Sequence, residues 1–560
     1  MDGLIRALDG TNLKTVIEFH GCVWHGCTQC FKNRSKLMPN GLTADESFQK
    51  TVEKVETIKN LGYVVKEFWE CEVNRMLEQD PEMKLFFDSV EIQDPIDPRD
   101  GFYGGRTNAT KLYHCCKPEE KIGYVDVCSL YPWVCKRGSF PLGHPTIITE
   151  NFLPTNNTNH PYHGLIKCQV LPPKGLLHPV LPRRANGKLM FPLCARCADE
   201  CQQEQCDHMA DERCFWGTWC TIELYKALEL GYQLLQISEV WHYTNWATFD
   251  GKDPKSGLFN EYIDNFLQLK QQASGWPDWI KNDEDKLSYL KKYKEIEGID
   301  LLPEKINKNA AQRQLAKLCL NSFWGKFGQR NNMSKMEYFD ELVKYFEVVC
   351  DEENEVDAIR IIDPVEVAVT YHKAEDFVEA LPNTNSVIAA YVTAQARLKL
   401  YSYIEQLQSR VLYFDTDSII YLSCPEDEYM PPIGDFLGDM TDELSDYGSG
   451  SYIQEFVAGG PKQYALKIWS TAKQEYCHVV KIRGFTLNST TANELNFDNL
   501  KKVVLAFVES GKKEEISVFL SRIERCADRK VVTKNMKKIY RSVYDKRSVL
   551  SDGSTLPYGY

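Results

Sequence analysis

Long apolar runs are missing from this 560-residue sequence, and so is a basic segment followed by a hydrophobic one near residue 1. Because a membrane-spanning helix needs about 20 mostly apolar residues in a row, the sequence predicts no such helix, and it predicts no secretory signal. Low-complexity tracts are also missing, while 43% of the residues are hydrophobic and 26% are charged. This composition is that of a globular protein, and the length indicates several domains.

Positive charge is scarce overall, since the formal net charge is −13. That balance argues against a nucleic-acid partner, but binding depends on local rather than total charge. Residues 501–550 hold 14 Lys and Arg against 6 Asp and Glu, in a stretch that we expect to be largely helical. This basic stretch is either a solvated helical face or a surface for DNA phosphates.

The 20 cysteines are scattered, with clusters at 22–30 and 194–214. This distribution predicts a reducing, intracellular compartment and one or two metal sites rather than a disulfide framework. In the second cluster the spacing of thiols and imidazole suits a structural, tetrahedral Zn²⁺ site, for which we expect the ligands Cys194, Cys197, Cys206 and His208. Cys201 is a spare ligand, and free thiols on a loop are the alternative.

Two carboxylates stand in the apolar stretch VLYFDTDSIIYL (411–422), which indicates two short strands joined by a tight turn. Asp415 and Asp417 would point to one side, where unpaired charges repel each other and lose hydration. Divalent cations, which prefer hard oxygen ligands, relieve such a pair. A solvated Asx turn is the simpler interpretation if the pair stands alone.

A third carboxylate has a similar setting, because KIGYVDVCSLYPWV (121–134) is an apolar strand with Asp126 at its end. With the acidic hairpin it predicts a two-metal site for phosphoryl transfer, in which one ion activates a 3′-hydroxyl and the other neutralises a triphosphate. Tyr131 would then lie under the incoming sugar and exclude a 2′-hydroxyl by a clash.

The segment NAAQRQLAKLCLNSFWGKFGQR (309–330) has a helical pattern with polar residues every four positions. Arg313 and Lys317 would form a cationic ladder for triphosphate oxygens, while Asn321 and Gly325 would let a base pair approach. An ordinary amphipathic helix with a basic face is the alternative.

The segments DVCSLYP, KLCLNSFWG and YFDTDS, in this order, resemble motifs A, B and C of family B DNA polymerases. GPKQYAL (460–466) is similar to their KxY motif, and FYGGRT (102–107) is similar to their YxGG motif. The form and spacing of these motifs resemble the protein-primed branch, and within it the polymerases of Polinton/Maverick elements, linear plasmids and viruses.

The resemblance implies roles for individual residues. Asp126 and Asp417 would be the principal ligands of two Mg²⁺ ions, with Asp415 in support. The nucleotide would be bound by Tyr131, Arg313, Lys317, Asn321 and Gly325. The DNA would be bound by Gly104, Gly105, Trp324, Lys462 and Tyr464. Trp324 stands where the family prefers tyrosine, so it keeps a flat ring but lacks the hydroxyl.

The resemblance also implies an α+β, multidomain fold: a right-hand polymerase with an antiparallel palm sheet, helical fingers and a thumb, preceded by a small α/β restriction-endonuclease-like domain. The expected parts are a nuclease-like segment (1–98), the YxGG motif and first palm part (99–190), a zinc-binding-type insertion (191–245), the fingers (246–330), a TPR2-like insertion of alternating strands (331–385), the remaining palm (386–480) and a thumb (481–560). Residues 386–409 are expected to form a helix that leads into the acidic hairpin.

Ahead of these motifs, DGTNLKTVIEFHGCVWHGCTQCF and IKNLGYVVKEFWECEV resemble very-short-patch-repair-like nucleases. This implies a metal held by Asp9 and Glu18, with His20 or His25 as acid or base. Zinc is an equal alternative here, with the ligands Cys22, His25, Cys27 and Cys30. Because His20 replaces the family lysine, we expect a structural or DNA-positioning role rather than cleavage.

No plausible set of exonuclease carboxylates precedes residue 100, so either proofreading is lost or Met1 lies inside a longer reading frame, which we favour. We expect template and primer DNA, deoxynucleotides and a terminal priming protein as partners, no membrane, and a location in the nucleus ahead of the mitochondrion. The alternative function is a non-catalytic DNA-binding remnant of a mobile element. A reverse transcriptase would carry adjacent aspartates, whereas Thr416 separates them here.

Overall fold

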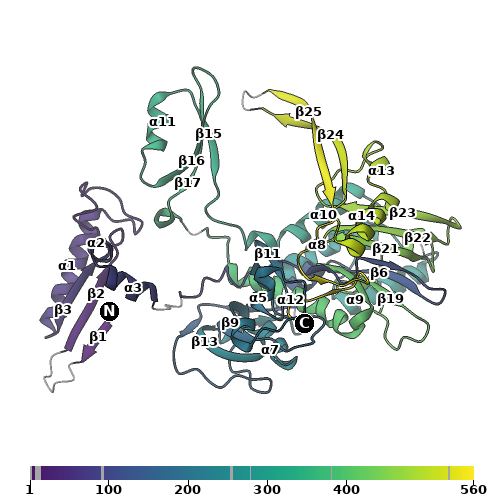
Figure 1. Cartoon of the computed structure of the whole chain (residues 1–560), viewed down its shortest axis with the longest axis horizontal. Helices are drawn as coiled ribbons and strands as arrows, with labels where there is room; N and C mark the ends of the chain where they lie inside the picture. Colours follow the sequence, from purple (N-terminus) through teal and green to yellow (C-terminus); the bar gives the residue numbers. More distant parts are fainter. Residues whose placement is uncertain are drawn as a thin grey trace. The chain divides into compact units, whose positions relative to one another are not determined.

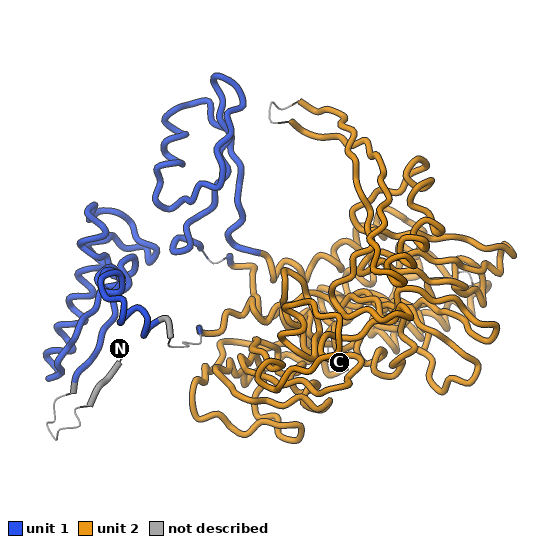
Figure 2. The backbone as a smooth tube through the Cα atoms, in the orientation of Figure 1, with its two compact units in different colours: residues 1–94, 330–381 blue, residues 95–329, 382–560 orange. Residues whose placement is uncertain are grey.

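The computed structural model of the chain describes residues 3–6, 14–89, 94–251, 256–277, 279–379, 381–526 and 530–560. The chain forms two compact units (Figure 2), which are Met1–Asp94 with Arg330–Leu381 and Pro95–Gln329 with Pro382–Tyr560. Both units combine sheets with helices, so the expected α+β, multidomain class is confirmed. Within the described ranges, every helix is too short or too polar to cross a bilayer.

The amino-terminal part of the first unit is a small α/β structure, drawn in purple in Figure 1. Its elements are β1 (Gly3–Arg6), β2 (Lys14–His20), α1 (Ala44–Asn60), β3 (Val64–Trp69), α2 (Glu70–Gln79) and α3 (Pro81–Ser89). β1 is antiparallel to β2, whereas β2 and β3 are parallel. A parallel pair needs a crossover, which α1 supplies, and Thr43 and Glu46 close a capping box at the start of this helix.

The second part of the first unit is a three-stranded antiparallel sheet in the order β15-β17-β16. Its elements are β15 (Lys335–Phe339), α11 (Leu342–Val349), β16 (Asn354–Ile361) and β17 (Val367–Lys373). The expectation of alternating strands is wrong for α11. Tyr345, Val348 and Val349 pack against buried residues of the sheet, and this spacing of three and four residues places them on one face of a helix.

A nine-stranded antiparallel sheet forms the centre of the second unit, in the order β23-β22-β21-β6-β19-β18-β4, with β20 on β6 and β5 on β21. Its strands are β4 (Thr107–Ala109), β5 (Tyr113–Cys115), β6 (Lys121–Val127), β18 (Val411–Asp415), β19 (Ser418–Ser423), β20 (Met440–Asp442), β21 (Tyr452–Gly460), β22 (Gln463–Ser470) and β23 (Glu475–Ile482). Both of its faces are covered, so apolar residues follow one another without a break in strands such as β18.

Alternate residues of the central strands enter two different cores. In β19, Ile419 joins the core that contains α12 (Ser386–Leu407), while Ile420 joins the core that contains α14 (Phe497–Ser510). The helix expected at 386–409 is therefore present as α12. Because the sheet lies between two buried layers, the ends of its strands are held rigidly.

Two further groups of elements flank the central sheet. One is a four-stranded sheet with its neighbours: β7 (Ser139–Leu142), β8 (Thr146–Ile148), β9 (Gly164–Leu171), β10 (Arg183–Ala185), β11 (Lys188–Met190), α5 (Ala195–Glu200), α6 (Ala210–Arg213), β12 (Phe215–Cys220), α7 (Thr221–Glu229), β13 (Gln233–His242) and β14 (Asn245–Thr248). The other is helical: α4 (Leu130–Arg137), α8 (Asn260–Gln272), α9 (Asp283–Glu297) and α10 (Ala310–Ser322). Buried Lys136 joins three of these helices, since its Nζ lies 2.7 Å from Asp264 and 3.3 Å from Glu297.

The basic stretch near the carboxyl end differs from the helical expectation. After α14, the chain forms a long hairpin of β24 (Glu515–Arg525) and β25 (Val531–Arg541), drawn in yellow in Figure 1. Ile516, Val518 and Leu520 are buried at alternate positions, which is the period of a strand. The excess of Lys and Arg carries no information on backbone period, so the helical expectation is wrong for this hairpin.

Candidate active site and metal centres

Three aspartates meet where β6, β18 and β19 lie side by side. Ser418 of β19 pairs with Asp126 of β6 and also with Asp415 of β18. Asp417 occupies the turn between β18 and β19, where Thr416 takes a left-handed conformation with φ of 58°. Since neighbouring strands lie about 5 Å apart, this register brings together carboxylates that are distant in the sequence.

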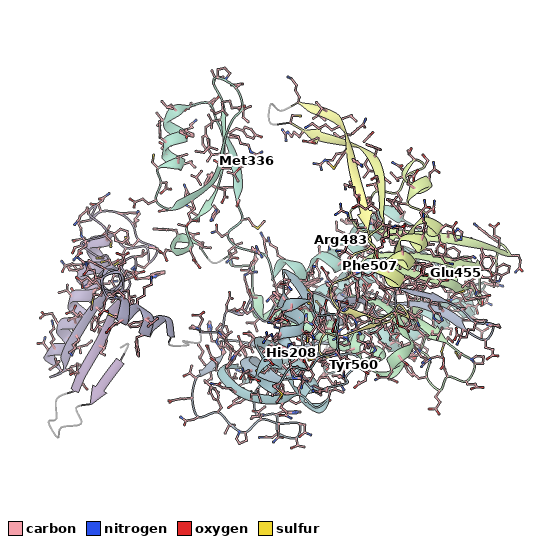
Figure 3. The ribbon with its side chains drawn as sticks, in the orientation of Figure 1. His208, Met336, Glu455, Arg483, Phe507 and Tyr560 are labelled. Atoms are coloured by element: carbon pink, nitrogen blue, oxygen red, sulfur yellow. The ribbon has the colours of Figure 1, made fainter. Side chains whose placement is uncertain are left out.

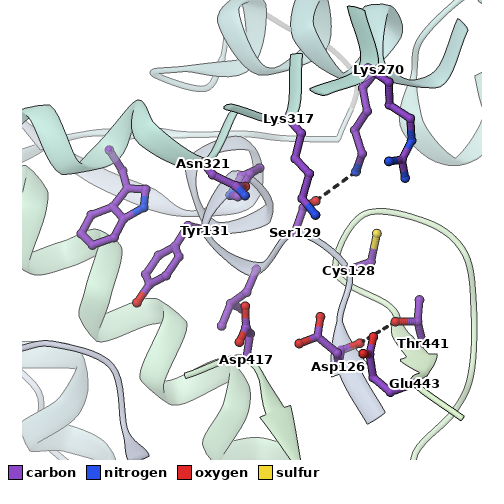
Figure 4. A pocket seen from close by; sticks show the side chains of 14 residues that line it. Asp126, Cys128, Ser129, Tyr131, Lys270, Lys317, Asn321, Asp417, Thr441 and Glu443 are labelled. Carbon is purple, nitrogen blue, oxygen red and sulfur yellow. Dashed lines mark hydrogen bonds between the residues drawn. The ribbon is translucent and has the colours of Figure 1, made fainter. Parts of the chain in front are cut away.

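Asp126 and Asp417 line a pocket of about 700 Å³, shown in Figure 4. Four of the five predicted nucleotide contacts line the same pocket, namely Tyr131, Arg313, Lys317 and Asn321. The fifth, Gly325, does not line it, although its neighbour Trp324 in the short 3₁₀ turn Trp324–Lys326 does.

Burial and mutual repulsion govern the charge of these carboxylates. Burial, followed by the charge of Asp417, raises the pKa of Asp126 to about 8. Burial, followed by the charge of Asp415, raises the pKa of Asp417 to about 6. A bound divalent cation would favour the ionised forms and relieve the repulsion. Clustered carboxylate oxygens that are costly to ionise alone fit Mg²⁺, a hard cation.

Glu443 and Thr441 belong to the same pocket and were missed in the sequence. Thr441 of β20 pairs with Asp126 of β6, and its hydroxyl donates to the backbone carbonyl of Asp126 at 3.1 Å. Glu443 follows this strand, and its charge raises the pKa of both Asp126 and Asp417. No local pattern marks Glu443 as functional, because only the pairing of β20 with β6 brings it to the pocket.

A third cation joins Arg313 and Lys317 in the pocket. Lys270, near the end of α8, donates from Nζ to the Ser129 hydroxyl at 3.2 Å (Figure 4). Burial lowers the pKa of Lys270, which is the expected effect on a cation removed from water. The sequence gives no signal for Lys270, because this lysine lies on α8 whereas Arg313 and Lys317 lie on α10. The packing of α8 against α10 brings the three cations together.

Two aromatic rings form a flat wall of the pocket. The rings of Tyr131 and Trp324 stack with centroids 4.3 Å apart and an interplanar angle of 21°. Phe102 of the FYGGRT segment meets the edge of Trp324 at 6.5 Å between centroids. The indole therefore offers the pocket a planar surface.

A second pocket, of about 440 Å³, is lined by all three aspartates together with Lys462, Tyr464 and Lys481. Lys462 takes a left-handed conformation, with φ of 60°, between β21 and β22. Tyr464 is only 5% exposed, and its hydroxyl lies 3.1 Å from that of Tyr124. Lys462 thus offers this pocket a flexible cation, whereas Tyr464 is held by the sheet.

The two glycines of FYGGRT lie near the acidic turn. A Cβ added to Gly105 would lie 2.8 Å from Oγ1 of Thr416, so a side chain at position 105 would displace the turn. The carbonyl of Gly104 accepts from buried Arg397 at 2.9 Å, and Arg397 forms an ion pair with Glu223 at 2.7 Å. These contacts support the turn, and the DNA-binding role of the two glycines stays a prediction.

The four expected zinc ligands near α5 come together. The ligand atoms of Cys194, Cys197, Cys206 and His208 all lie within 4.8 Å of one another. Nδ1 of His208 is 3.4, 3.2 and 3.7 Å from the three sulfurs in turn. The spare Cys201 stands outside this group, because its Sγ faces the carbonyls of Ala198 and Asp545. The group can hold a metal ion.

A second group of thiols lies in the first unit. The sulfurs of Cys22, Cys27, Cys30 and Cys71 lie within 4.8 Å of one another. The structure places Cys71, and not His25, in this group, because Nδ1 of His25 lies 2.9 Å from the Thr51 hydroxyl. Because β3 runs parallel to β2, both strands end at the same edge of the sheet. Cys71, at the start of α2, therefore lies beside the loop that follows β2.

Of the predicted nuclease residues, the structure describes Glu18, His20 and His25 but not Asp9. Glu18 and His20 are fully buried, and Lys54 forms an ion pair with Glu18. Nε2 of His20 lies 3.4 Å from Glu67, and the rings of His20 and His25 have centroids 4.9 Å apart. Asp9 lies outside the described residues, so the pair of Asp9 and Glu18 stays a prediction.

Comparison with known proteins gives one family. Residues 77–288 match the family model of DNA polymerase type B, organellar and viral, and this stretch contains FYGGRT, Asp126 and Tyr131. No curated protein matches the chain.

Similar solved structures include phi29 DNA polymerase complexed with primer-template DNA, at 17% identity and a TM-score of 0.48, with 79% of this chain and 62% of that chain covered. They also include phi29 DNA polymerase with primer-template DNA and incoming nucleotide substrates, at 17% identity and a TM-score of 0.47, with 79% and 61% covered. The chain thus spans less than two thirds of the length of these polymerases. Its stretch 77–288, which contributes Asp126 and Tyr131 to the site, is similar to the organellar and viral type B DNA polymerases.

Proposed function

We propose that this protein is a DNA-templated DNA polymerase that adds deoxynucleotides to a 3′-hydroxyl. The observation that carries this proposal is a single pocket with the carboxylates of Asp126 and Asp417 at one side and the cation of Lys317 at the other (Figure 4). Arg313 lines the same pocket. Phosphoryl transfer to a nucleic acid needs an acidic edge for metal ions and a basic edge for a triphosphate. The match of residues 77–288 to type B polymerases supports the same function.

Asp126 and Asp417 would hold two Mg²⁺ ions, with Asp415 in support. When bound, the ions would activate the 3′-hydroxyl and neutralise charge on the triphosphate and the leaving group. Lys317 would bind triphosphate oxygens, and Lys270 stands close enough to assist it. The acidic residues therefore orient the acceptor and the metal ions, while the lysines orient the donor.

The aromatic wall would select the nucleotide. Tyr131 would lie under the sugar and leave no space for a 2′-hydroxyl, so selection would act through a clash. Trp324, stacked on Tyr131, and Asn321 would face the nascent base pair. In the second pocket, Lys462 would bind the primer end, and the basic hairpin of β24 and β25 would lie along duplex phosphates.

Protein-primed replication of a mobile element or virus-like genome is part of this proposal, and we place it in the nucleus ahead of the mitochondrion. The protein-primed part is supported by the form of the motifs, and it implies a terminal priming protein as a partner and a DNA-encircling role for residues 331–385. The alternative, a non-catalytic DNA-binding remnant, is less favoured because Asp126, Asp417 and Lys317 are all present and meet in one pocket.

We further propose zinc as the metal of both thiol groups, because thiolate and imidazole ligands in fours suit a tetrahedral structural site. For the amino-terminal part, burial of Glu18 and His20 supports a DNA-positioning role over cleavage, since a hydrolytic site must admit a phosphate and water.

Primer extension with Mg²⁺ tests the proposed function. We expect the wild-type chain to extend a DNA primer on a DNA template, and we expect Asp417→Asn to reduce the rate by at least about 10³-fold. Equal extension by both proteins would contradict the proposal. DNA binding without extension by the wild-type chain would favour the remnant, and efficient extension on an RNA template would favour a reverse transcriptase.

A further inference from the structure

Residues 542–560, called the strap below, dock on the second unit through backbone and side-chain hydrogen bonds. β26 (Ser548–Val549) pairs with β27 (Thr555–Leu556) to make a small hairpin. Tyr544, Arg547 and Tyr558 are each at most 4% exposed. The burial of these three large side chains shows that the strap packs against the rest of the second unit.

The beginning and the middle of the strap dock beside β4, the neighbour of β18 in the central sheet. The hydroxyl of Tyr544 donates to the carbonyl of Ala109 at 2.7 Å, at the end of β4. The backbone N–H of Thr555 donates to the carbonyl of Thr110 at 2.8 Å, and the N–H of Leu112 donates to the carbonyl of Gly553 at 2.7 Å. The strap therefore extends the hydrogen bonding of the segment that follows β4.

β4 transmits this contact to the acidic site. It pairs with β18 so that Thr107 stands opposite Asp415, and the Thr107 hydroxyl donates to Oδ1 of Asp415 at 2.8 Å. The strap also carries Lys546, which lies near enough to Asp415 and Lys462 to experience the charge of both. A shift of the strap would thus act on the side of the site that faces the second pocket.

The other end of the strap docks on the metal-ligand group. The N–H of Leu193 donates to the carbonyl of Tyr558 at 2.7 Å, and Tyr558 is buried in one cluster with Cys194 and Cys197. Gly559 has φ of 86°, and a Cβ at this position would collide with Cys194. Figure 3 labels His208 of this group and the terminal residue Tyr560.

The loop that carries the ligands has little regular structure, and contacts such as the ion pair of Arg183 with Asp199 hold its first part. α5 is a six-residue helix, and the residues from its end to α6 form no regular element. Of the six buried residues in the cluster around it, two are ligand cysteines and one is Tyr558 of the strap. A core this small cannot order a loop alone, and small units of this kind depend on a structural metal.

We propose that a Zn²⁺ ion anchors the strap, and that its occupancy thereby sets the affinity of the acidic site for a primer terminus. Its ligands are Cys194, Cys197, Cys206 and His208. On binding, the three thiols release their protons to solvent and their sulfurs coordinate the ion. The anchor itself follows from the strap contacts, whereas its effect on the primer terminus rests on the proposed polymerase function.

The test compares Cys197→Ser with Cys214→Ser, a matched control. The Cys214 thiol faces the carbonyl of Asp211 and stands outside the ligand group. We expect Cys197→Ser to lose one equivalent of bound zinc relative to wild type, and we expect hydrogen exchange at the amides of Leu112 and Thr555 to rise at least tenfold. Cys214→Ser should match wild type in both measurements.

A second variant keeps the test decisive if Cys197→Ser fails to fold. Tyr544→Phe keeps every ligand and removes the hydroxyl that donates to the carbonyl of Ala109, so it should retain zinc while the same two amides exchange faster. In wild type, removal of zinc with a chelator should raise that exchange, and addition of zinc should restore it. Unchanged exchange after zinc loss would overturn the proposal, as would a wild-type chain with no zinc at this group.

A separate measurement tests the proposed effect of zinc on the affinity for a primer terminus. In Cys197→Ser we expect Kd for primer-template DNA to rise at least fivefold, while KM for the nucleotide stays within twofold of wild type. A rise in KM for the nucleotide alone would overturn this part. If the wild-type chain extends no primer, the polymerase function fails, yet zinc content and amide exchange still decide whether the metal anchors the strap.

Discussion

Nζ of Lys462 lies 2.8 Å from Oδ1 and 3.0 Å from Oδ2 of Asp415, so these residues form a close ion pair at the second pocket. The lysine is nearly half exposed, and exposed pairs of this kind contribute about 0–1 kcal/mol to stability. The pair therefore has little structural value. The proposed function has Lys462 move from Asp415 to a primer phosphate.

Replacement of Lys462 by Ala should weaken binding of primer-template DNA about tenfold and leave the melting temperature nearly unchanged, because a charge-assisted phosphate contact contributes about 1.5–3 kcal/mol. Fluorescence anisotropy with labelled primer-template DNA measures the first effect. Lys473→Ala, in the exposed turn after β22, is the control. Equal affinity of both variants would remove Lys462 from the primer site.

Asp126→Asn should stabilise the metal-free protein more at pH 8 than at pH 5. The pKa of Asp126 is raised to about 8 in the folded chain, so the folded state keeps a proton that the unfolded state releases. Stability contributed by this group is therefore present at low pH and is lost as pH rises towards 8. After allowance for partial exposure, we expect a gain of about 2 kcal/mol at pH 8.

Thermal denaturation in a chelator, measured for both proteins across this pH range, checks the effect. Addition of Mg²⁺ should then raise the melting temperature of wild type and change that of Asp126→Asn much less. Parallel pH profiles for the two proteins would show that Asp126 ionises normally.

Tyr131→Val should admit ribonucleotides, because it removes the ring that is stacked on Trp324 and would lie under the sugar. We expect discrimination against ribonucleotides, measured as a ratio of kcat/KM values, to fall about 10- to 100-fold. Tyr131→Phe retains the ring and should retain the discrimination. If Phe loses it as well, the hydroxyl rather than the ring makes the selection.

Cys71→Ser should lower the zinc content of the protein by one equivalent, whereas His25→Ala should not. The reason is geometric, since Cys71 stands in the ligand group of the first unit and His25 faces the Thr51 hydroxyl. Elemental analysis of the purified variants gives the answer. Loss of zinc in His25→Ala alone would restore the ligand set inferred from sequence spacing.

Glu443→Gln should raise the Mg²⁺ concentration needed for half-maximal primer extension about tenfold, because it removes one negative charge beside Asp126 and Asp417 without changing the size of the side chain. Glu426→Gln, an exposed residue of the loop after β19, is the matched control. An unchanged Mg²⁺ requirement in Glu443→Gln would assign this residue a purely structural part.

Some secondary-structure elements can be predicted from patterns that are local in the sequence. The acidic hairpin around Thr416 was recognisable because two apolar runs flank a polar turn, and α12 was recognisable from its length. The hairpin of β24 and β25 was not recognised, because its basic residues obscured the alternation of Ile516 and Val518. Local charge thus proved a poorer guide than periodicity.

The sequence by itself determined which chemistry is available: carboxylates at strand ends, cations at helical spacing, and thiols in a metal-binding pattern. Only the tertiary structure decided which of these groups meet. Glu443 reaches Asp126 through the pairing of β20 with β6, Lys270 reaches Lys317 through the packing of α8 against α10, and Cys71 joins Cys22 through a parallel strand pair. The physical reason is that such meetings depend on long-range hydrogen bonding and burial of apolar surface, for which neighbouring residues in the chain carry no signal.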